Sequence, residues 1–272
     1  MMVVIRISII VLTIIVGLAV GSFLNVVIYR LPNNMNLSKP ASHCPKCQSP
    51  IKWYDNIPVF SYIFLRGKCR HCHEKISFRY PAIELLNTIL WFACLVLFTN
   101  FIVPSFTCNW IKFGVSLVAC STLICIFFCD LDHMLIPDIL TGVLLLCAVV
   151  LLLDKPDFDH ILLKVIGFGA MGLLFYLVNL VFKLSHKKDG IGEGDILLVM
   201  VGGLLLGIDQ MLYALIIACF SALIILLIVS LVKKERGREY PFAVFLTTGI
   251  VAALFSGEYV INWYMNLLGV IR

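Results

Sequence analysis

The sequence has few charged side chains. Only 14% of its 272 residues are Asp, Glu, Lys or Arg, whereas 61% are hydrophobic, and the mean hydropathy is +1.02. Soluble globular domains carry about 25% charged residues, so this composition excludes that class. The chain also lacks an internal repeat, and it lacks a glycine-rich loop in a strand–helix setting, which would mark a Rossmann-like nucleotide site. The composition is that of a membrane protein.

Long apolar runs take the place of the missing charge. A run of about 18 or more apolar residues can span a bilayer as a helix. The first run is too long for the core of a signal peptide and has no clear small-residue cleavage site, so we interpret it as an uncleaved span. Seven such segments are present, and a shorter run, Ile196–Ile208, would be an eighth span. The shorter run follows Asp195 and breaks at Asp209-Gln210. The seven longer segments are Ile7–Tyr29, Ala82–Phe98, Ile111–Cys129, Ile139–Leu153, Ile161–Phe182, Met211–Val232 and Phe242–Phe255.

The basic residues predict the orientation. Of 21 Lys and Arg residues, nine lie in 30–81, three in 183–195 and four in 233–241. Basic residues collect in cytoplasmic loops. Eight spans with the N-terminus outside place all three clusters on the cytoplasmic side, whereas seven spans would leave 233–241 outside. The net charge of +5 therefore reports orientation, and no nucleic-acid partner is needed to explain it.

Residues 30–81 form the only long polar stretch, and they contain CPKC and CRHC. Two CxxC pairs separated by 21 residues predict a four-cysteine zinc site, because tetrahedral thiolate coordination needs four soft ligands. Disulfides and unrelated thiols are the alternatives. A cytoplasmic location disfavours disulfides, and four cysteines in two identical spacings rarely arise by chance. Metal binding would also supply folding free energy to a segment with little apolar core. The predicted zinc ligands are Cys44, Cys47, Cys69 and Cys72.

The predicted fold class is an all-α polytopic membrane protein with about eight transmembrane helices and a small zinc-ribbon-like domain after the first helix. The predicted parts are a first transmembrane helix (1–29), a cytoplasmic four-cysteine domain (30–81) and a helical core (82–272). A complete set of four thiolates leaves His43, His71 and His73 as solvated surface residues. The remaining cysteines are expected to be small buried hydrophobes; they are Cys94, Cys108, Cys120, Cys125, Cys129, Cys147 and Cys219.

Two acidic motifs lie at predicted cytoplasmic ends of spans. DLDHMLIPD contains Asp130, Asp132 and Asp138, and GIGEGDILL contains Asp195 at the start of the next apolar segment. The glycines at 190, 192 and 194 permit positive φ and close backbone approach. Helix capping with a flexible loop would explain Asp195 alone. Two carboxylates brought together would instead share one proton, so that one activates water while the other protonates a carbonyl oxygen.

These motifs, together with GSFLNVVIYRLP (21–32) and WYDNIPVFSYIFLRGKCRHC (53–72), resemble the type IV prepilin peptidases, a GxGD class of membrane aspartyl proteases. The resemblance covers nearly the whole chain. It implies that Asp130, seven residues before Pro137, and Asp195 of GEGD are the catalytic aspartates. It also implies that the four cysteines bind zinc. Asp132 would be a supporting carboxylate, and Asp138 the cap of the helix that starts near Ile139.

The family resemblance further implies cleavage of type IV prepilins or type II secretion pseudopilins at the cytoplasmic membrane face. It also implies methylation of the new N-terminus with S-adenosylmethionine, to which the sequence assigns no residues. Family members often have Lys two residues after the second aspartate, where this chain has Leu197, and the loss of that ammonium group would alter the electrostatics that set the pH optimum and the substrate preference. The sequence gives no oligomeric state.

Two other functions would each explain part of these features. A transporter would use intramembrane acids to relay protons or bind cations, but it predicts acids near the bilayer midplane and paired repeat halves. A membrane-tethered zinc ribbon that binds protein or nucleic acid would explain residues 30–81 and leave both acidic motifs without a role. The peptidase accounts for all of these features.

Overall fold

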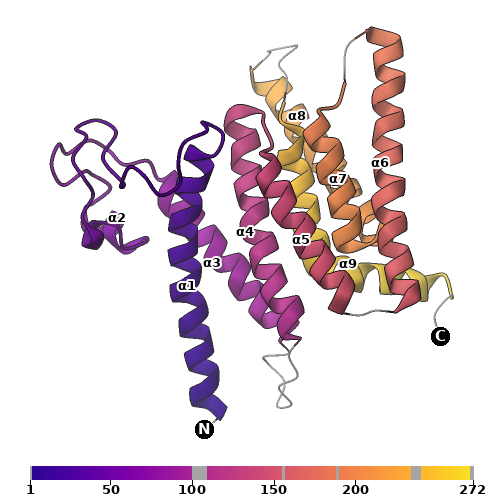
Figure 1. Ribbon diagram of the computed structural model, residues 1–272, viewed down its shortest axis with the longest axis horizontal. Coiled ribbons are helices and arrows are strands. Elements are labelled where there is room, and N and C mark those ends of the chain that lie inside the picture. The colour runs from indigo at the N-terminus through magenta and orange to yellow at the C-terminus, as the bar shows by residue number, and fades with distance from the viewer. Residues whose placement is uncertain (1, 100–108, 155–156, 188–189, 234–239, 270–272) are drawn as a thin grey trace. The chain divides into compact units, whose positions relative to one another are not determined.

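The computed structural model describes residues 2–99, 109–154, 157–187, 190–233 and 240–269. These residues form helices and contain no β-strand (Figure 1). The helices are α1 (Met2–Arg30), the 3-10 helix η1 (Trp53–Asp55), α2 (Phe60–Phe64), α3 (Arg79–Phe98), α4 (Trp110–His133), α5 (Asp138–Asp154), α6 (Phe158–His186), α7 (Glu193–Leu206), α8 (Ile208–Lys233) and α9 (Phe242–Leu267).

Each of the eight predicted apolar segments is a helix. Within the described residues, six helices are long and apolar enough to cross a membrane, namely α1, α3, α4, α6, α8 and α9. The other two are shorter, because α5 has 17 residues and α7 has 14. At 1.5 Å per residue α7 extends about 21 Å, less than the roughly 30 Å hydrocarbon core of a bilayer. The chain is an all-helical polytopic protein, and eight remains an approximate number of spans.

The break between α7 and α8 lies earlier than the sequence analysis placed it. The expected break was Asp209-Gln210, but α8 already includes both residues, and the chain turns at Gly207. Gly207 has φ +90°, a conformation that residues with a Cβ rarely adopt. Backbone conformation therefore sets the break, and the polar pair continues into the first turn of α8.

The structure separates into two compact units, residues 1–113 and 114–272. In the first unit, α1 and α3 run in opposite directions and pack together (Figure 1). A Cβ on Gly21 would lie 2.7 Å from the Glu84 Cα, so only glycine permits this approach. The buried Asn87 side-chain amide donates to the Gly17 carbonyl at 2.8 Å. Small residues and interhelical hydrogen bonds typically hold helices together in lipid.

The polar segment after α1 is tied to the helix ends. Arg30 is buried, and its guanidinium donates to the backbone carbonyls of Asn36, Leu37 and Pro40. Asn25 donates to the Tyr80 carbonyl at the start of α3. The polar residues of the GSFLNVVIYRLP motif therefore fix how the chain leaves α1 and enters α3.

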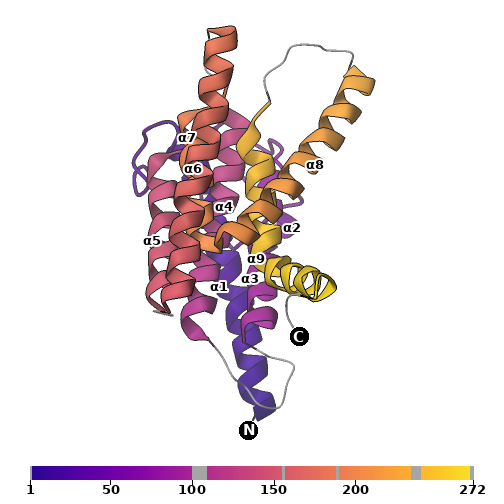
Figure 2. The ribbon, with the colours of Figure 1, turned by 90° about the vertical axis from the view of Figure 1, so that its right-hand side faces the viewer.

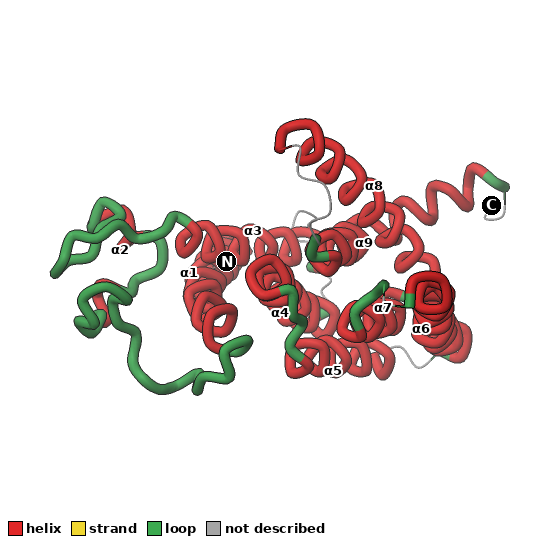
Figure 3. The backbone as a smooth tube through the Cα atoms, turned by 90° about the horizontal axis from the view of Figure 1, so that it is seen from above, coloured by secondary structure: helices red, strands yellow, loops and turns green. Residues whose placement is uncertain are grey.

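In the second unit the short helix α7 contacts α5, α6, α8 and α9, which surround it when the bundle is seen end-on (Figure 3). Its side chains Leu198, Val199 and Val201 are fully buried. The axes of α6 and α7 approach through Gly167 and Gly203, where a Cβ on Gly167 would lie 2.6 Å from the Gly203 carbonyl oxygen. A helix enclosed in this way need not cross the bilayer fully, because its neighbours cover it.

The helices of the second unit alternate in direction. Figures 1 and 2 show that α4, α6 and α8 end at the same end of the bundle at which α5, α7 and α9 begin. Asp130 lies in the last turn of α4, and Asp195 lies in the first turn of α7. The topology therefore brings the two acidic motifs to one end of this unit.

We expect Gly167→Ala to destabilise the second unit by about 1–3 kcal/mol, because its methyl group would be forced against the backbone of α7. Gly169→Ala is the matched control on the same helix, since a Cβ there meets nothing within 4 Å. The apparent melting temperature of the detergent-solubilised protein should fall for the first variant only. Equal melting temperatures for both variants would contradict the close α6–α7 packing.

Candidate active site and metal centre

Asp130 is buried, with 5% of its surface exposed. Its Oδ2 accepts a hydrogen bond of 3.3 Å from the backbone N–H of Val244, and the backbone N–H of Ala243 also bonds to the carboxylate. Both N–H groups belong to the first turn of α9, where backbone donors have no partner within the helix. The N-cap residue of α9 is Pro241, which makes no side-chain capping bond. Asp130 therefore supplies the N-terminal cap of α9 from a distant part of the sequence.

Asp195 is placed by the start of its own helix. Gly192 is the N-cap of α7 and has no side chain that could cap it. The Asp195 carboxylate turns back to the backbone N–H of Gly192, as the third residue does in a capping box. Asp195 is half-buried, and its Oδ1 is buried without a hydrogen-bond partner among the described residues. A buried carboxylate oxygen without a partner is uncommon in folded proteins.

The two aspartates are brought together by the segment between α4 and α5. Met134 adopts φ +50° and ends α4, and Ile136 follows it. A Cβ on Gly194 would lie 3.2 Å from the Ile136 Cβ, so the first turn of α7 packs closely on this segment. Asp130 and Asp195 interact electrostatically as a result. The two carboxylates therefore lie at the same end of the second unit, close enough for their charges to interact.

Of the two properties expected of the glycines before Asp195, the structure shows close approach and not positive φ. Gly192 has φ −65°, and the glycines with positive φ among the described residues are Gly67, Gly207 and Gly269. Close approach is the property that the loop uses, because a Cβ on Gly190 would clash with the Phe182 ring. Positive φ was therefore the wrong explanation for this motif.

Asn179 holds the same loop and was missed in the sequence analysis. Its side-chain oxygen accepts hydrogen bonds from the backbone N–H groups of Gly190 at 2.9 Å and Ile191 at 3.1 Å. The bonds fix the chain just before α7 to the side of α6. An Asn within an apolar span is a signal that could have identified it, since polar side chains there usually bond to neighbouring segments. The first turn of α9 gave a weaker signal, a proline before an apolar run.

The other acidic residues lie outside this pair. Asp132 is exposed two residues after Asp130. Asp138 was expected to cap the next helix, but it is the first residue of α5 itself, and the carbonyl of Pro137 accepts the first bonds from Leu140 and Thr141. Leu197, which occupies the place of the family's frequent lysine, is partly exposed on α7.

The four predicted zinc ligands converge in the first unit. The sulfur atoms of Cys44, Cys47, Cys69 and Cys72 all lie within 4.8 Å of one another, with Cys44–Cys72 at 3.8 Å and Cys47–Cys69 at 4.0 Å. Four sulfurs around a tetrahedral ion at about 2.3 Å would be separated by roughly 3.8 Å. The cluster therefore has the dimensions of a tetrahedral thiolate metal site.

The two CxxC turns have the same backbone structure. The N–H of Gln48 bonds to the Cys44 carbonyl, and the N–H of His73 bonds to the Cys69 carbonyl. Gln48 and His73 both have positive φ, at +57° and +56°. Each turn closes with a single isolated β-bridge, so the segment is a pair of knuckles without the named strands of a full ribbon.

Hydrogen bonding favours thiolate in part of the cluster. The Ser49 hydroxyl and backbone lower the pKa of Cys47 to about 6. The Glu74 backbone N–H also favours the Cys72 thiolate, but desolvation and the three neighbouring sulfurs raise the pKa of Cys72 to about 12. Four adjacent thiolates need a cation between them, and metal ligation requires that form.

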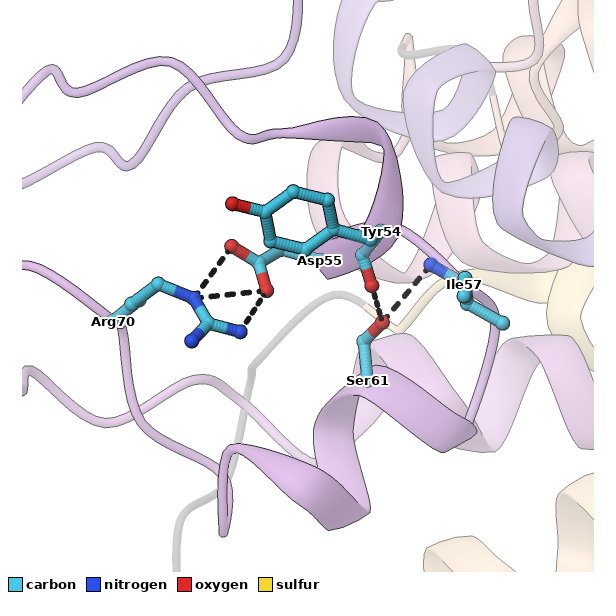
Figure 4. Close-up of polar contacts among 5 residues, drawn as sticks. All are labelled: Tyr54, Asp55, Ile57, Ser61 and Arg70. Atoms are coloured by element: carbon cyan, nitrogen blue, oxygen red, sulfur yellow. Dashed lines mark hydrogen bonds and ion pairs between the residues drawn. The ribbon is translucent and has the colours of Figure 1, made fainter.

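One knuckle is joined to the WYDN segment before α2. Arg70, between Cys69 and Cys72, donates from Nε to Asp55 Oδ2 at 2.8 Å and makes an ion pair with the same carboxylate. These bonds hold the pKa of Asp55 below its ordinary value. The Ser61 hydroxyl donates to the Tyr54 carbonyl and accepts from the Ile57 N–H (Figure 4). The cysteine cluster, η1 and α2 are therefore connected by side-chain bonds.

The remaining predictions for histidine and cysteine hold with one exception. His71 and His73 are exposed and His43 is half-buried, and none of them belongs to the sulfur cluster. Cys219 was expected to be buried but is exposed on α8, and Cys108 lies outside the described residues. The cysteines that are buried as predicted are Cys94, Cys120, Cys125, Cys129 and Cys147.

The sequence is similar to two family profiles and to several named proteins. The bacterial peptidase A24 N-terminal domain matches residues 15–98, and the type IV leader peptidase family matches residues 117–227. A Neisseria gonorrhoeae protein named prepilin leader peptidase/N-methyltransferase is 34% identical over 93% of each chain. Proteins of the same name are 35% identical in Vibrio cholerae (77% of this chain, 82% of the relative) and 33% identical in Legionella pneumophila (92% of each). No solved structure matches the chain.

Proposed function

The chain belongs to the type IV leader peptidase family, and on that premise we propose that Asp130 and Asp195 are its catalytic pair. It is a multi-pass inner-membrane enzyme, an aspartic peptidase that cleaves prepilins and also N-methylates them. The observation that supports the residue assignment is the position of both carboxylates at one end of the second unit, in the last turn of α4 and the first turn of α7 (Figure 1). The transporter and the tethered zinc ribbon are not needed to explain any feature of the site.

The pair would act on the peptide bond between leader and mature prepilin. Two neighbouring carboxylates hold one proton between them, because both cannot ionise readily. The ionised member takes a proton from water, the water oxygen attacks the peptide carbonyl, and the protonated member donates to the carbonyl oxygen. Collapse of the tetrahedral intermediate breaks the C–N bond, and a proton passes to the leaving amine. The dyad titrates as a unit.

The surroundings of the two carboxylates differ. Asp130 receives backbone N–H bonds from the positive end of α9, which stabilise a negative charge. The Asp195 Oδ1 has no partner among the described residues. Asp130 is thus suited to carry the charge of the dyad and Asp195 to carry the shared proton towards the substrate.

Asp130→Asn and Asp195→Asn should each lower the rate of leader removal by at least about 100-fold, because one of the two proton-transfer roles is lost. Both variants should still fold, since an Asn oxygen can accept the same backbone hydrogen bonds. Purified enzyme in detergent is incubated with a prepilin, and loss of the leader is followed by mass.

Asp132→Asn is the matched control, because Asp132 is exposed two residues from Asp130. It should retain most of the activity. Substantial cleavage by either dyad variant would exclude the pair, and complete inactivity of Asp132→Asn would show that the wrong member of DLD had been chosen.

We further propose that the four-cysteine cluster of residues 30–81 binds Zn²⁺. The sulfur separations of 3.8 and 4.0 Å fit a tetrahedral ion, and two identical knuckles supply the ligands. Such an ion would stabilise a segment that buries little apolar surface. Cys44, Cys47, Cys69 and Cys72 would hold it, and with no ligand position open its role would be structural.

Replacing Cys44 and Cys47 together by Ser should remove the single bound Zn²⁺, because two ligands cannot close a tetrahedral site. Cys219→Ser, outside the cluster, should leave the metal content unchanged. Elemental analysis of the purified proteins gives the metal per chain, and circular dichroism should show that the transmembrane helices persist. Undiminished zinc in the double variant would contradict the proposed ligands.

The active site is proposed to face the cytoplasm. The end of the second unit that carries Asp130 and Asp195 is also the end at which α6 reaches Lys183, Lys187 and the 183–195 cluster. Basic clusters mark the cytoplasmic side. A prepilin has its cleavage junction at that face, so its helix could enter from the lipid while the leader stays in the cytoplasm. Part of the helix must unwind there to expose the bond.

Single cysteines at Ser185 and Asp159 should therefore react with membrane-impermeant reagents from opposite sides. Both residues are exposed, and they lie near opposite ends of α6. Ser185→Cys and Ser38→Cys should react with the impermeant reagent only after the membrane is opened so that the reagent reaches the cytoplasmic side. Asp159→Cys should react in intact cells. The background lacks other reactive thiols outside the zinc cluster. The reverse pattern would place the dyad on the wrong face for this substrate.

Use of S-adenosylmethionine follows from the methyltransferase activity of the family. Within the described residues we assign no side chain to this cofactor, so no step of methyl transfer is derived. No nucleic-acid partner is proposed, because membrane orientation explains the positive charge.

A further inference from the structure

The short segment made of η1 and α2, residues 53–64, exposes large apolar side chains. Trp53 is 81% exposed, Phe64 82%, Ile63 63% and Phe60 53%. They lie in the one long polar stretch of the chain, where the membrane-spanning helices do not account for them. Large exposed aromatic and aliphatic side chains gathered in one short segment indicate an interaction surface.

The depth of this segment along the spanning helices identifies what it meets. The backbone N–H of Val59, the N-cap of α2, donates to Glu84 Oε2 at 2.7 Å. Glu84 lies five residues inside α3 and packs on Gly21, which is nine residues before the end of α1. At 1.5 Å per residue these positions are about 8 Å and 13 Å inside the helix ends. Figure 1 accordingly shows α2 beside α1 rather than beyond its end.

Such a depth corresponds to the edge of the hydrocarbon core. The headgroup region occupies about 6 Å on each side of a 30 Å core, so a segment 8–13 Å inside the helix ends reaches the boundary between headgroups and acyl chains. Trp and Tyr are favoured at this boundary because their rings are amphipathic, and Phe is favoured on the apolar face of interfacial segments. Trp53, Phe60 and Phe64 match that preference.

The charges around the segment suit an anionic surface. Lys52 comes directly before Trp53, and Arg66 and Lys68 follow α2; all three are exposed. Residues 30–81 contain nine basic residues and only two acidic residues before Glu84, namely Asp55 and Glu74. Asp55 already pairs with Arg70. Anionic phospholipid headgroups attract such a polybasic segment.

The segment is held in shape independently of any partner. The Asp55–Arg70 pair joins η1 to a cysteine knuckle, and Ser61 joins α2 back to the turn at Tyr54 and Ile57 (Figure 4). Tyr62 lies on the inner side, in edge contact with Phe78. A fixed backbone lowers the entropic cost of inserting the outer side chains.

We propose that residues 53–64 form a monotopic membrane anchor. Trp53, Phe60, Ile63 and Phe64 insert at the boundary of headgroups and acyl chains, and Lys52, Arg66 and Lys68 bind anionic phospholipid headgroups. The anchor holds the four-cysteine domain against the bilayer surface. It depends on the membrane embedding of the chain and not on its peptidase activity.

Photocrosslinking in nanodiscs tests the anchor directly. The full-length protein carries p-benzoylphenylalanine in place of Phe64 and is reconstituted in bilayers that contain phosphatidylglycerol. After irradiation, intact mass reports whether a phospholipid has been added. The same residue in place of Phe23, exposed on the spanning helix α1, is the positive control, and in place of Lys46, exposed on the first knuckle, the negative control.

The anchor requires phospholipid adducts at Phe64 comparable to those at Phe23 and several-fold above those at Lys46. A yield at the Lys46 level, or a crosslink to a second copy of the chain, would overturn it. A crosslink to added prepilin that replaces the lipid adduct would make the surface a substrate site instead. None of these readouts requires cleavage, so they are independent of the catalytic proposal.

The binding of the basic side chains to anionic headgroups is tested separately, with two variants. Arg66→Gln should weaken the binding of residues 53–64 to bilayers that contain phosphatidylglycerol by about fivefold, since one basic residue near an anionic surface contributes a factor of that size. It should have no effect in phosphatidylcholine alone. Lys75→Gln, exposed on the second knuckle, is the matched control. An equal loss for Arg66→Gln in both lipids would refute headgroup binding by that side chain.

Discussion

The hydrogen bonds between the Asp130 carboxylate and the first turn of α9 are the interaction on which the site depends. A carboxylate buried in a helix bundle is unstable unless donors surround it, and the beginning of a helix has backbone N–H groups without internal partners. The backbone N–H groups of α9 stabilise the buried carboxylate, and the carboxylate is the acceptor that these N–H groups lack within their own helix. Because Asp130 lies in the last turn of α4 and Val244 in the first turn of α9, this contact also fixes the relative position of two helices that are far apart in sequence. The carboxylate that we propose activates the attacking water is thus held in place by the first turn of α9.

Much of the fold could be predicted from the sequence because it follows from local properties. Apolar length identified the helices, and the paired spacing of Cys44, Cys47, Cys69 and Cys72 identified the sulfur cluster. Long-range contacts were not accessible in this way. Asp130 caps α9, and the Asn179 side chain bonds to the backbone at Gly190 and Ile191. Both contacts join residues that no sequence periodicity relates. The break at Gly207 was misplaced because charge is a weaker signal for a helix end than backbone conformation.

Glycine has two different functions in this chain. At Gly207 it supplies a positive φ, whereas at Gly167, Gly203 and Gly21 it brings helix backbones into contact. Without a hydrophobic force between helices in lipid, close packing of small residues contributes much of their association. The enclosed position of α7 follows from this packing. Its enclosure in turn allows a helix too short to span the bilayer to present Asp195 at the end of the bundle.

The GEGD motif can be understood from these two functions. Gly192 is an N-cap of ordinary φ, and a Cβ there would lie 3.4 Å from Asp195 Oδ2, which is normal van der Waals contact. Gly194 is more restrictive, because a Cβ there would lie 3.2 Å from the Cβ of Ile136, in the segment that follows Asp130. A methyl group at 194 would therefore press on the segment between α4 and α5, while one at 192 would meet only a side chain that can rotate. The second glycine of the motif therefore allows the first turn of α7 to pack closely on the segment that follows Asp130, and this packing supports the placement of the proposed catalytic pair.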